Sequence, residues 1–514
     1  MNSDNNFNFG VTRIFLFLIF AVLGMSAITT QAQTIRYVKP NGTGNGSSWA
    51  NAAGNIQDMI DASVAGNQVW VAAGTYIPTT QTGSDAHRKT FLLKDGVHLY
   101  GGFAGNESSI NSRANSDKDN NGKIEAWEFT NETILSGKID NSDENYRSFR
   151  VVRCPSQFSR ATLFDGFSVR YAGGSRDVYS GGGIYANGKI VVSRCVVSNN
   201  SAPIGGGICN TNGGTVENCL IENNGYSIYV SGGAIYATGG GIDNSNYGIV
   251  RNCVVRNNNI TVLNWSSSSQ ADALGGGISN SGIVSNCCVY NNYIYASRIG
   301  RGGGIHSNFS GIVYCSTVVN NVSQGTAQGV ASNIYHASTT SKDYNCISTA
   351  YDYSQNFIRH PSFSGYATNA QETVELQQAD WRLRAGSRYI DAGSLANLPE
   401  WVINGTDLAG SPRTTNGKIS IGAYEYSSTT NTIALPYVDK SVKVYPNPAN
   451  ISLFVECEGH STIKLYDMLG KEALTQNANG KTEINISHLS KGIYIVNILS
   501  SEGRIIGNSK IVKQ

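Results

Sequence analysis

Oxygen-bearing side chains are concentrated in one short stretch of the chain, between Asp117 and Glu128. The stretch reads Asp-Lys-Asp-Asn-Asn-Gly-Lys-Ile-Glu-Ala-Trp-Glu, with a glycine in the middle, where a calcium loop needs a sharp turn. Hard cations such as Ca²⁺ are bound by about six to eight oxygen atoms from carboxylates, amides and backbone carbonyls. The composition and spacing of this stretch therefore predict a calcium-binding loop.

The stretch resembles the EF-hand loop position by position. The predicted ligands are the side chains of Asp117, Asp119 and Asn121, the backbone carbonyl of Lys123, Glu125 through a water molecule, and Glu128 with both carboxylate oxygens. Ile124 is expected to point inward and to tie the loop to the body of the protein. We expect the calcium to have a structural role. The alternative is a solvated acidic insertion that binds no metal.

A second candidate site is basic. Arg298, Arg301 and His306 fall within one expected turn, where they would bind an anionic glycan. The alternative is a solvated face, because charged side chains mostly remain at the surface. Tyr226, Tyr229, Tyr293 and Tyr295 lie in insertions and would either stack on sugars or pack those loops.

No catalytic residues are predicted from the middle of the chain. Hydrolysis of a glycosidic bond generally requires two carboxylates in one cleft. The acids between residues 180 and 345 occupy differing positions of a repeat, so no facing pair is expected. They are Glu217, Glu222, Asp243, Asp272 and Asp343.

The repeat that positions these residues has two blocks. A Gly-Gly-Gly-Ile block begins at residues 181, 205, 239, 275 and 302. A second block ends in paired asparagines and begins at Cys195, Cys219, Cys253 and Cys287. The unequal spacing of these cysteines indicates one structural turn that carries insertions of variable length.

Short β-branched runs bounded by Gly and Asn are typical of strands. The simplest solid that repeats them is a parallel β-helix, in which equivalent side chains form ladders about 4.8 Å apart. The cysteine position is expected to be an inward ladder of small apolar side chains, and the paired asparagines a ladder at a turn. Disulfides among Cys154, Cys209 and Cys346 stay open, because exported proteins often contain them.

The expected entry to the solenoid is a short helix over residues 55–63 and a strand from Gln68. This passage resembles the N-terminal cap of right-handed β-helix proteins of the pectin-lyase-like superfamily, and residues 390–393 and 421–426 resemble their closing coil. The resemblance covers residues 33–426. It implies a cap at 33–80, an insertion with the calcium-type loop at 106–145, and the clearest coils at 180–345.

The resemblance also makes a polysaccharide lyase or glycoside hydrolase one functional expectation. The Gly-Gly-Gly-Ile blocks resemble those of outer-membrane adhesins, although Val-x-Asn-Asn stands where those proteins have Phe-x-x-Asn. Because the repeats are poor in carboxylates, we favour an adhesin-like or glycan-binding surface protein. Its expected partner is an extracellular glycan or a host surface protein, and a polysaccharide-cleaving enzyme is the alternative.

Both ends of the chain carry expected export signals. An apolar run from Ile14 to Leu23 is too short to span a bilayer and predicts a signal peptide over residues 1–32, with an uncleaved anchor as the alternative. Residues 427–437 are expected to be a linker. Residues 438–514 alternate in the manner of a small β-sandwich.

The last segment resembles a known export domain. Tyr445-Pro446-Asn447-Pro448, Leu465-Tyr466-Asp467 and Lys510-Ile511-Val512-Lys513 resemble the C-terminal sorting domain of type IX secretion cargo. The alternative is a generic accessory β-sandwich. The resemblance implies the type IX secretion machinery as a partner, and a location at the outer-membrane surface or outside the cell.

The composition of the chain limits the kinds of partner that it can have. The chain has 514 residues, of which 14% are charged, with 38 Lys and Arg against 36 Asp and Glu. This near balance, without a basic patch, argues against nucleic acid as a partner. No further stretch is apolar enough to span a membrane, so no transmembrane span is expected in the mature chain. The predicted fold class is all-β: a right-handed parallel β-helix solenoid, then a small immunoglobulin-like β-sandwich.

Overall fold

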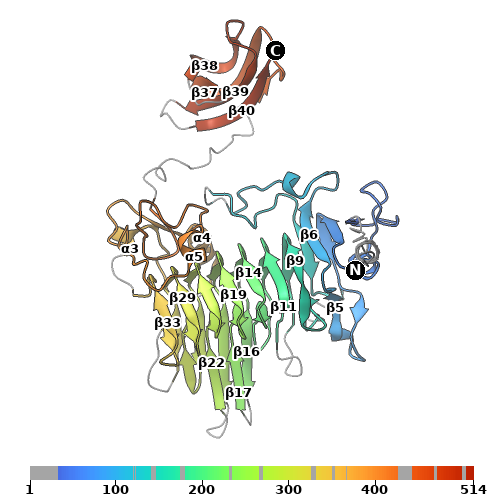
Figure 1. Cartoon of the computed structure of the whole chain (residues 1–514), viewed down its shortest axis with the longest axis vertical. Coiled ribbons are helices and arrows are strands. Elements are labelled where there is room, and N and C mark those ends of the chain that lie inside the picture. The colour runs from blue at the N-terminus through green and yellow to red at the C-terminus, as the bar shows by residue number, and fades with distance from the viewer. Residues whose placement is uncertain are drawn as a thin grey trace, which may run out of the picture.

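The computed structural model describes residues 33–119, 121, 123–140, 146–173, 180–230, 234–264, 270–325, 332–349, 353–365, 367–426, 443–467, 472–500 and 505–514. The predicted signal peptide and linker lie outside these residues. The described chain forms two units with separate hydrophobic cores, a parallel β-helix up to residue 426 and an antiparallel unit from residue 443 (Figure 1). The predicted fold class is confirmed at this level.

Three parallel sheets run along the β-helix. Sheet 1 contains β1 (Ile35–Val38), β2 (Gln68–Ala72), β6 (His98–Phe103), β9 (Phe158–Asp165), β11 (Ile184–Ser193), β14 (Thr215–Glu217), β19 (Ile249–Arg251), β24 (Ile283–Ser285), β29 (Ile312–Tyr314) and β33 (Lys342–Tyr344). Sheet 2 contains β3 (Gly74–Tyr76), β7 (Thr133–Ser136), β10 (Phe167–Arg170), β12 (Val196–Ser198), β15 (Leu220–Glu222), β20 (Val254–Arg256), β25 (Cys288–Tyr290) and β30 (Thr317–Val319).

Sheet 3 shares the long strand β11 with sheet 1. Its other parallel strands are β5 (Lys89–Leu92), β8 (Val152–Arg153), β13 (Ile208–Thr211), β18 (Ile242–Asn244), β23 (Ile278–Asn280), β28 (Ile305–Ser307) and β32 (Ile334–His336). The short strand β4 (Thr80–Gln81) pairs antiparallel with β5. Each coil therefore passes through sheets 3, 1 and 2 in that order.

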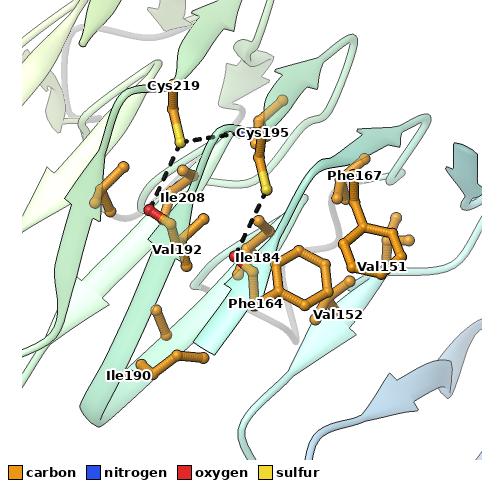
Figure 2. Close-up of a cluster of buried hydrophobic side chains, with 14 of the residues drawn as sticks. Val151, Val152, Phe164, Phe167, Ile184, Ile190, Val192, Cys195, Ile208 and Cys219 are labelled. Atoms are coloured by element: carbon orange, nitrogen blue, oxygen red, sulfur yellow. Dashed lines mark hydrogen bonds between the residues drawn. The ribbon is translucent and has the colours of Figure 1, made fainter. Parts of the chain in front are cut away.

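Rows of β-branched side chains from the three sheets fill the interior of the coils. Ile184, Ile208 and Ile242 form one fully buried row, and Val192, Val216 and Val250 form another. β-branched side chains suit this position because they pack well on a pleated surface. Figure 2 shows how the interior side chains of successive coils stack on one another.

The cysteine ladder lies inside, as predicted. Cys195, Cys219, Cys253 and Cys287 are completely buried, and the thiol of Cys219 lies 3.6 Å from the backbone carbonyl of Val192 in the preceding coil (Figure 2). All ten cysteines of the chain are free, so the disulfide alternative is not what the structure shows. Burial raises the pKa of the ladder thiols Cys195, Cys219 and Cys253, which keeps them protonated and unreactive.

The paired asparagines form the predicted ladder at a turn. The first of each pair adopts a left-handed backbone, with φ of 55° at Asn223 and 54° at Asn257. The second is buried, and its side-chain amide donates to the amide oxygen one coil on, at 3.1 Å from Asn224 to Asn258 and 3.0 Å from Asn258 to Asn292. The Gly triplets lie where successive coils approach too closely for a side chain, since a Cβ at Gly206 would lie 2.6 Å from the carbonyl oxygen of Gly240.

The unequal coil lengths come from a projection, here called the fin, between sheets 2 and 3. It consists of two small parallel sheets: β16 (Gly225–Val230), β21 (Asn259–Asn264), β26 (Tyr293–Ala296) and β31 (Val322–Gln324), and β17 (Ala234–Thr238), β22 (Gln270–Leu274) and β27 (Ile299–Arg301). The fin extends at the bottom of Figure 1. Tyr226 and Ile260 lie in its core, whereas Tyr229 and Tyr295 are exposed.

Irregular segments close the two ends. The entry helix α2 (Ile56–Asp61) begins at Asn55, whose side chain accepts from the backbone N–H of Gln57. Past the last coil, the chain covers the outer face of sheet 2 with packed aromatic and aliphatic side chains that include Phe357, Leu376 and Trp381. The elements here are α3 (Tyr353–Asn356), β34 (Phe357–Arg359), α4 (Ala370–Gln377), β35 (Asp380–Leu383) and α5 (Glu400–Ile403). Among the residues that the structure describes, Ala86–Arg88 and Ile110–Ser112 form 3₁₀ turns.

The C-terminal unit is antiparallel, as expected. Its strands are β36 (Lys443–Tyr445), β37 (Ser452–Asp467), β38 (Glu472–Asn485), β39 (Gly492–Ser500) and β40 (Ile505–Lys513). The long β37 pairs with β36, β38 and β39, and β40 pairs with β39. Leu465, Ile484 and Val496 are among the side chains of its own core.

The asparagine ladder yields a stability prediction. Asn258→Ala should lower the free energy of unfolding by roughly 2–5 kcal/mol, because it leaves the buried carbonyls of Ile221 and Arg256 and the N–H of Asn224 without these hydrogen bonds. Urea unfolding followed by circular dichroism measures the change. Asn106→Ala, at an exposed position, is the control and should change little. Equal midpoints for the two variants would contradict a stabilising ladder.

Candidate functional site

An insertion of the chain folds over the outer face of sheet 2. It leaves after β6, returns at β7 and is held at its neck by Arg113, which donates to Asp165 at 2.7 Å and to the Gly101 carbonyl at 2.8 Å. The Arg113 guanidinium also lies over the ring of Phe129 at 4.8 Å. Backbone hydrogen bonds close the neck, from Ser116 to Glu128 at 2.9 Å and from Thr130 to Ala114 at 2.8 Å. The loop from 117 to 128 is therefore fixed at both ends.

The loop curls its carboxylates around one point. Oxygen atoms of Asp117, Asp119 and Glu128 all lie within 4.8 Å of one another. The Asn121 N–H donates to Asp117 at 3.1 Å and to Asp119 at 3.2 Å, while Glu128 accepts from the backbone of Lys118 at 3.0 Å and of Glu125 at 2.9 Å. Three of the six predicted ligands are thus brought together by the backbone itself.

The cluster is electrostatically strained by its own charges. Burial, followed by the neighbouring carboxylate of Glu125, raises the pKa of Glu128 to about 8. Burial also raises the pKa of Asp119 to about 6, even though Arg256 acts in the opposite direction. Glu125 Oε2 is buried without a hydrogen-bond partner. An orphaned oxygen beside three converging carboxylates fits a bound cation, because hard cations bind carboxylate oxygens.

The expectation for Ile124 is wrong. Its side chain is 43% exposed, whereas Phe129 is buried and Trp127 packs with the core on the outer face of sheet 2. Lys123 and Glu125 turn inward on either side of it: the Lys123 ammonium lies 3.1 Å from Asp380 and Glu125 accepts from the Asn121 amide at 3.1 Å. The contacts of Lys123 and Glu125 hold this stretch against the body of the protein, while the side chain of Ile124 between them faces solvent.

A pocket of about 290 Å³ lies between this loop and sheet 2. It is lined by Lys118, Asp119, Trp127, Glu128, Phe129, Glu132, Thr133, Gly166, Phe167, Ser168, Arg170, Val196, Leu220, Glu222, Arg256 and Gln377. We call it the sheet 2 pocket. Four carboxylates and three cationic groups thus meet there, beside aromatic side chains.

Most of these charges are paired with one another. Glu132 accepts from Arg170 and, at 2.6 Å, from the hydroxyl of Ser168. Glu222 pairs with Arg256 at 2.8 Å. Of the residues that the structure describes, none forms an ion pair with Lys118. Arg170 Nε is buried without a partner, so the pocket keeps unused donors.

Sequence reasoning missed this pocket. It predicted no facing pair among the acids between residues 180 and 345, but Glu222 meets three carboxylates from outside the coils. The only available signal was that Glu222 and Arg256 occupy equivalent positions of successive coils, 34 residues apart, on an outward row of sheet 2. The partners Glu132 and Arg170 had no distinguishing pattern.

The three basic residues of the second candidate site make different contacts. Arg298 pairs with Asp272 of the fin, while the Arg301 guanidinium lies over the ring of Tyr335 at 4.9 Å. His306 stacks on the same ring at 5.5 Å and is 3% exposed. Burial, and next the charge of Arg301, lowers the pKa of His306 to about 4, so the imidazole is neutral near pH 7. An anion-binding role for these three residues stays a prediction.

The C-terminal unit is matched by a family model. Residues 443–514 match the model described as the secretion system C-terminal sorting domain. These residues are the sorting domain of an exported protein. The predicted type IX sorting signal is thereby confirmed, and it directs the chain to the cell surface or the extracellular space. In the described part of the chain, none of the helices combines the length and hydropathy that a bilayer crossing requires.

A solved structure aligns weakly with the chain. No curated protein matches the chain. Among solved structures, the crystal structure of pectate lyase Pel9A aligns with a TM-score of 0.37 and 14% sequence identity, covering 76% of this chain and 96% of that one. The activity in that title belongs to that protein, and similarity at this level does not transfer it.

Two arginines of one coil give a matched test of the site. Arg256 is buried and also contacts Tyr290 and the Leu376 carbonyl, so Arg256→Gln leaves Glu222 uncompensated and should lower the free energy of unfolding by roughly 3–5 kcal/mol. Arg251, whose side chain is 46% exposed, pairs with Glu217 one coil back, and Arg251→Gln should cost about 1 kcal/mol or less. Urea unfolding compares the two variants, and similar losses would contradict the buried role of Arg256.

Proposed function

We propose that this exported protein binds extracellular glycans at the sheet 2 pocket and acts at the cell surface as an adhesin-like receptor. One observation carries the proposal: a polar pocket of about 290 Å³ with aromatic side chains and charges of both signs on the outside of the solenoid. A sugar presents hydroxyl groups that donate and accept, and apolar ring faces. These two features are matched by Lys118, which forms no ion pair within the described residues, by the orphaned Arg170 Nε, and by the rings of Trp127 and Phe129.

We further propose that calcium is a structural cofactor of the same site. The loop supplies Asp117, Asp119 and Glu128 within 4.8 Å, with Asn121, Glu125 and the carbonyl of Lys123 in the remaining ligand positions. A cation there would offset the mutual repulsion of the carboxylates. It would also hold Asp119, Trp127 and Glu128 in place as one wall of the pocket.

Calcium titration tests this cofactor. Calorimetry on the full chain should show one saturable site, and Glu128→Gln should weaken it by at least about tenfold, since position twelve of such loops contributes two oxygens. Calcium should also raise the melting temperature, by linkage to the folded state. Asp61→Asn, at an exposed carboxylate outside the insertion, should behave as wild type. Equal heats for Glu128→Gln and wild type, or no heat at all, would remove calcium from the proposal.

Glycan retention tests the pocket. On immobilised neutral and acidic polysaccharides, Lys118→Ala should reduce retention by about tenfold on the glycan class that binds best, because it removes an unpaired charged donor. Lys189→Ala changes the same charge at an exposed position of β11 outside the pocket and should leave retention unchanged. If no polysaccharide is retained, or both variants lose retention equally, the glycan-binding role is wrong.

A second candidate function, polysaccharide lyase, is favoured by Lys118. Its side chain lines the pocket without an ion-pair partner among the described residues, and a lysine amine in its neutral form can act as a base. In a β-elimination the base takes the proton next to a uronate carboxyl, the released electron pair forms a C=C bond and the glycosidic C–O bond breaks. The oxygen leaves on the departing sugar and takes up a proton from water. Incubation of the full chain with uronate polysaccharides, followed by ultraviolet absorbance of unsaturated ends, tests it. Products that form with wild type and disappear with Lys118→Ala would make the enzyme the primary function.

A further inference from the structure

A second, much smaller pocket lies on the outside of sheet 3, near the N-terminal end of the solenoid. The hairpin of β4 and the 3₁₀ turn Ala86–Arg88 fold against β5 and β8 there. The pocket has a volume of about 20 Å³ and is lined by Thr82, Arg88, Thr90, Phe149, Arg150 and Arg153. It shares no residue with the sheet 2 pocket.

The lining contains three guanidinium groups and no carboxylate. Within the described ranges, Arg88, Arg150 and Arg153 form no ion pair, whereas Arg170 and Arg256 of the sheet 2 pocket each pair with a glutamate. Arg150 lies over the ring of Tyr185 at 4.8 Å and donates to the Ser180 carbonyl. Burial, followed by the charge of Arg153, lowers the pKa of Arg150. The cluster is therefore an uncompensated concentration of positive charge.

The guanidinium groups are the free donors of this pocket, whereas its two threonine hydroxyls have only lone pairs left, which accept. The hydroxyl of Thr82 donates to the Arg88 carbonyl at 3.1 Å, and that of Thr90 donates to the Val151 carbonyl at 3.2 Å, so both protons are already used. Arg153 Nε is buried without a hydrogen-bond partner. A buried donor without an acceptor is costly, and three guanidinium groups together require an acceptor that carries negative charge.

The volume of the pocket limits what can enter. One water-sized atom occupies about 10–15 Å³ on this scale, so about 20 Å³ admits one or two oxygens and excludes a sugar ring. A carboxylate or the face of a sulfate fits this limit, with the rest of the ligand outside. Arginine is well suited to such groups because its planar fork binds two oxygens at once.

We propose that the pocket formed by Arg88, Arg150 and Arg153 binds an oxyanion substituent, a carboxylate or a sulfate, of an acidic glycan. The site is separate from the calcium loop and from the sheet 2 pocket. It therefore stands or falls independently of the function proposed above. An exported solenoid with two such sites would hold an extended glycan at two points along its length.

Calorimetric titration of the full chain tests the site with three probes at constant ionic strength: sodium sulfate, sodium acetate and, as the blank, sodium chloride. Wild type should bind sulfate or acetate saturably at one site, and the tighter of the two identifies the substituent. Arg153→Gln should weaken that binding by about tenfold or more. Arg359→Gln, at an exposed arginine of β34, changes the same charge and should bind as wild type.

Further variants and probes distinguish this pocket from the sheet 2 pocket and from a peptide-binding surface. Lys118→Ala alters the sheet 2 pocket and should leave oxyanion binding intact, which separates failure of this site from failure of the proposed function. If circular dichroism shows that Arg153→Gln is misfolded, Arg88→Gln replaces it.

With sulfated, uronate and acidic-peptide oligomers as larger probes, binding of the peptide alone would overturn the glycan assignment. Absence of saturable binding of either oxyanion, or equal affinity in wild type and Arg153→Gln, would overturn the site itself.

Discussion

The buried asparagine ladder is the constraint on which the rest of the structure depends. Every coil must turn sharply at the end of sheet 2, and a turn inside a solenoid exposes backbone groups that no strand can satisfy. Asn224, Asn258 and Asn292 satisfy them from within, and each also bonds to its counterpart in the next coil. The ladder thereby fixes the register between coils. The fin departs just after the ladder, whereas the insertion that contains the acidic loop departs between β6 and β7.

Because the coils are fixed, segments outside the repeat can be placed accurately on them. The sheet 2 pocket combines the coil strands, which provide Glu222 and Arg256, with two segments outside the repeat. These are the insertion that contains Asp119 and Glu128, and Gln377 at the end of α4. Ion pairs join them across long separations in the sequence. Loops can carry functional groups on a rigid scaffold without disturbing its core, and this arrangement follows that pattern.

The export domain and the β-helix are stabilised by separate hydrophobic cores. The sorting domain has its own core and shares no buried cluster with the solenoid. The chain carries ten free cysteines into an environment that favours disulfides, yet Cys195, Cys219 and Cys253 are buried with raised pKa values. Thiols in that state are poor nucleophiles, so the ladder acts as packing.

The sequence by itself determined the repeating architecture, the export domain and the content of the acidic loop. Those features depend on local spacing: a Cys or Asn recurring at one repeat position must occupy one ladder, and consecutive loop residues must lie near each other. Only the tertiary structure decided which charges meet. Glu132, Arg170 and Glu222, like Arg88 and Arg153, are distant in the sequence, and their proximity follows from how loops fold onto the coils. The expectation for Ile124 failed in the same part of the chain: its neighbour Lys123 pairs with Asp380, more than two hundred residues away, while the Ile124 side chain is exposed.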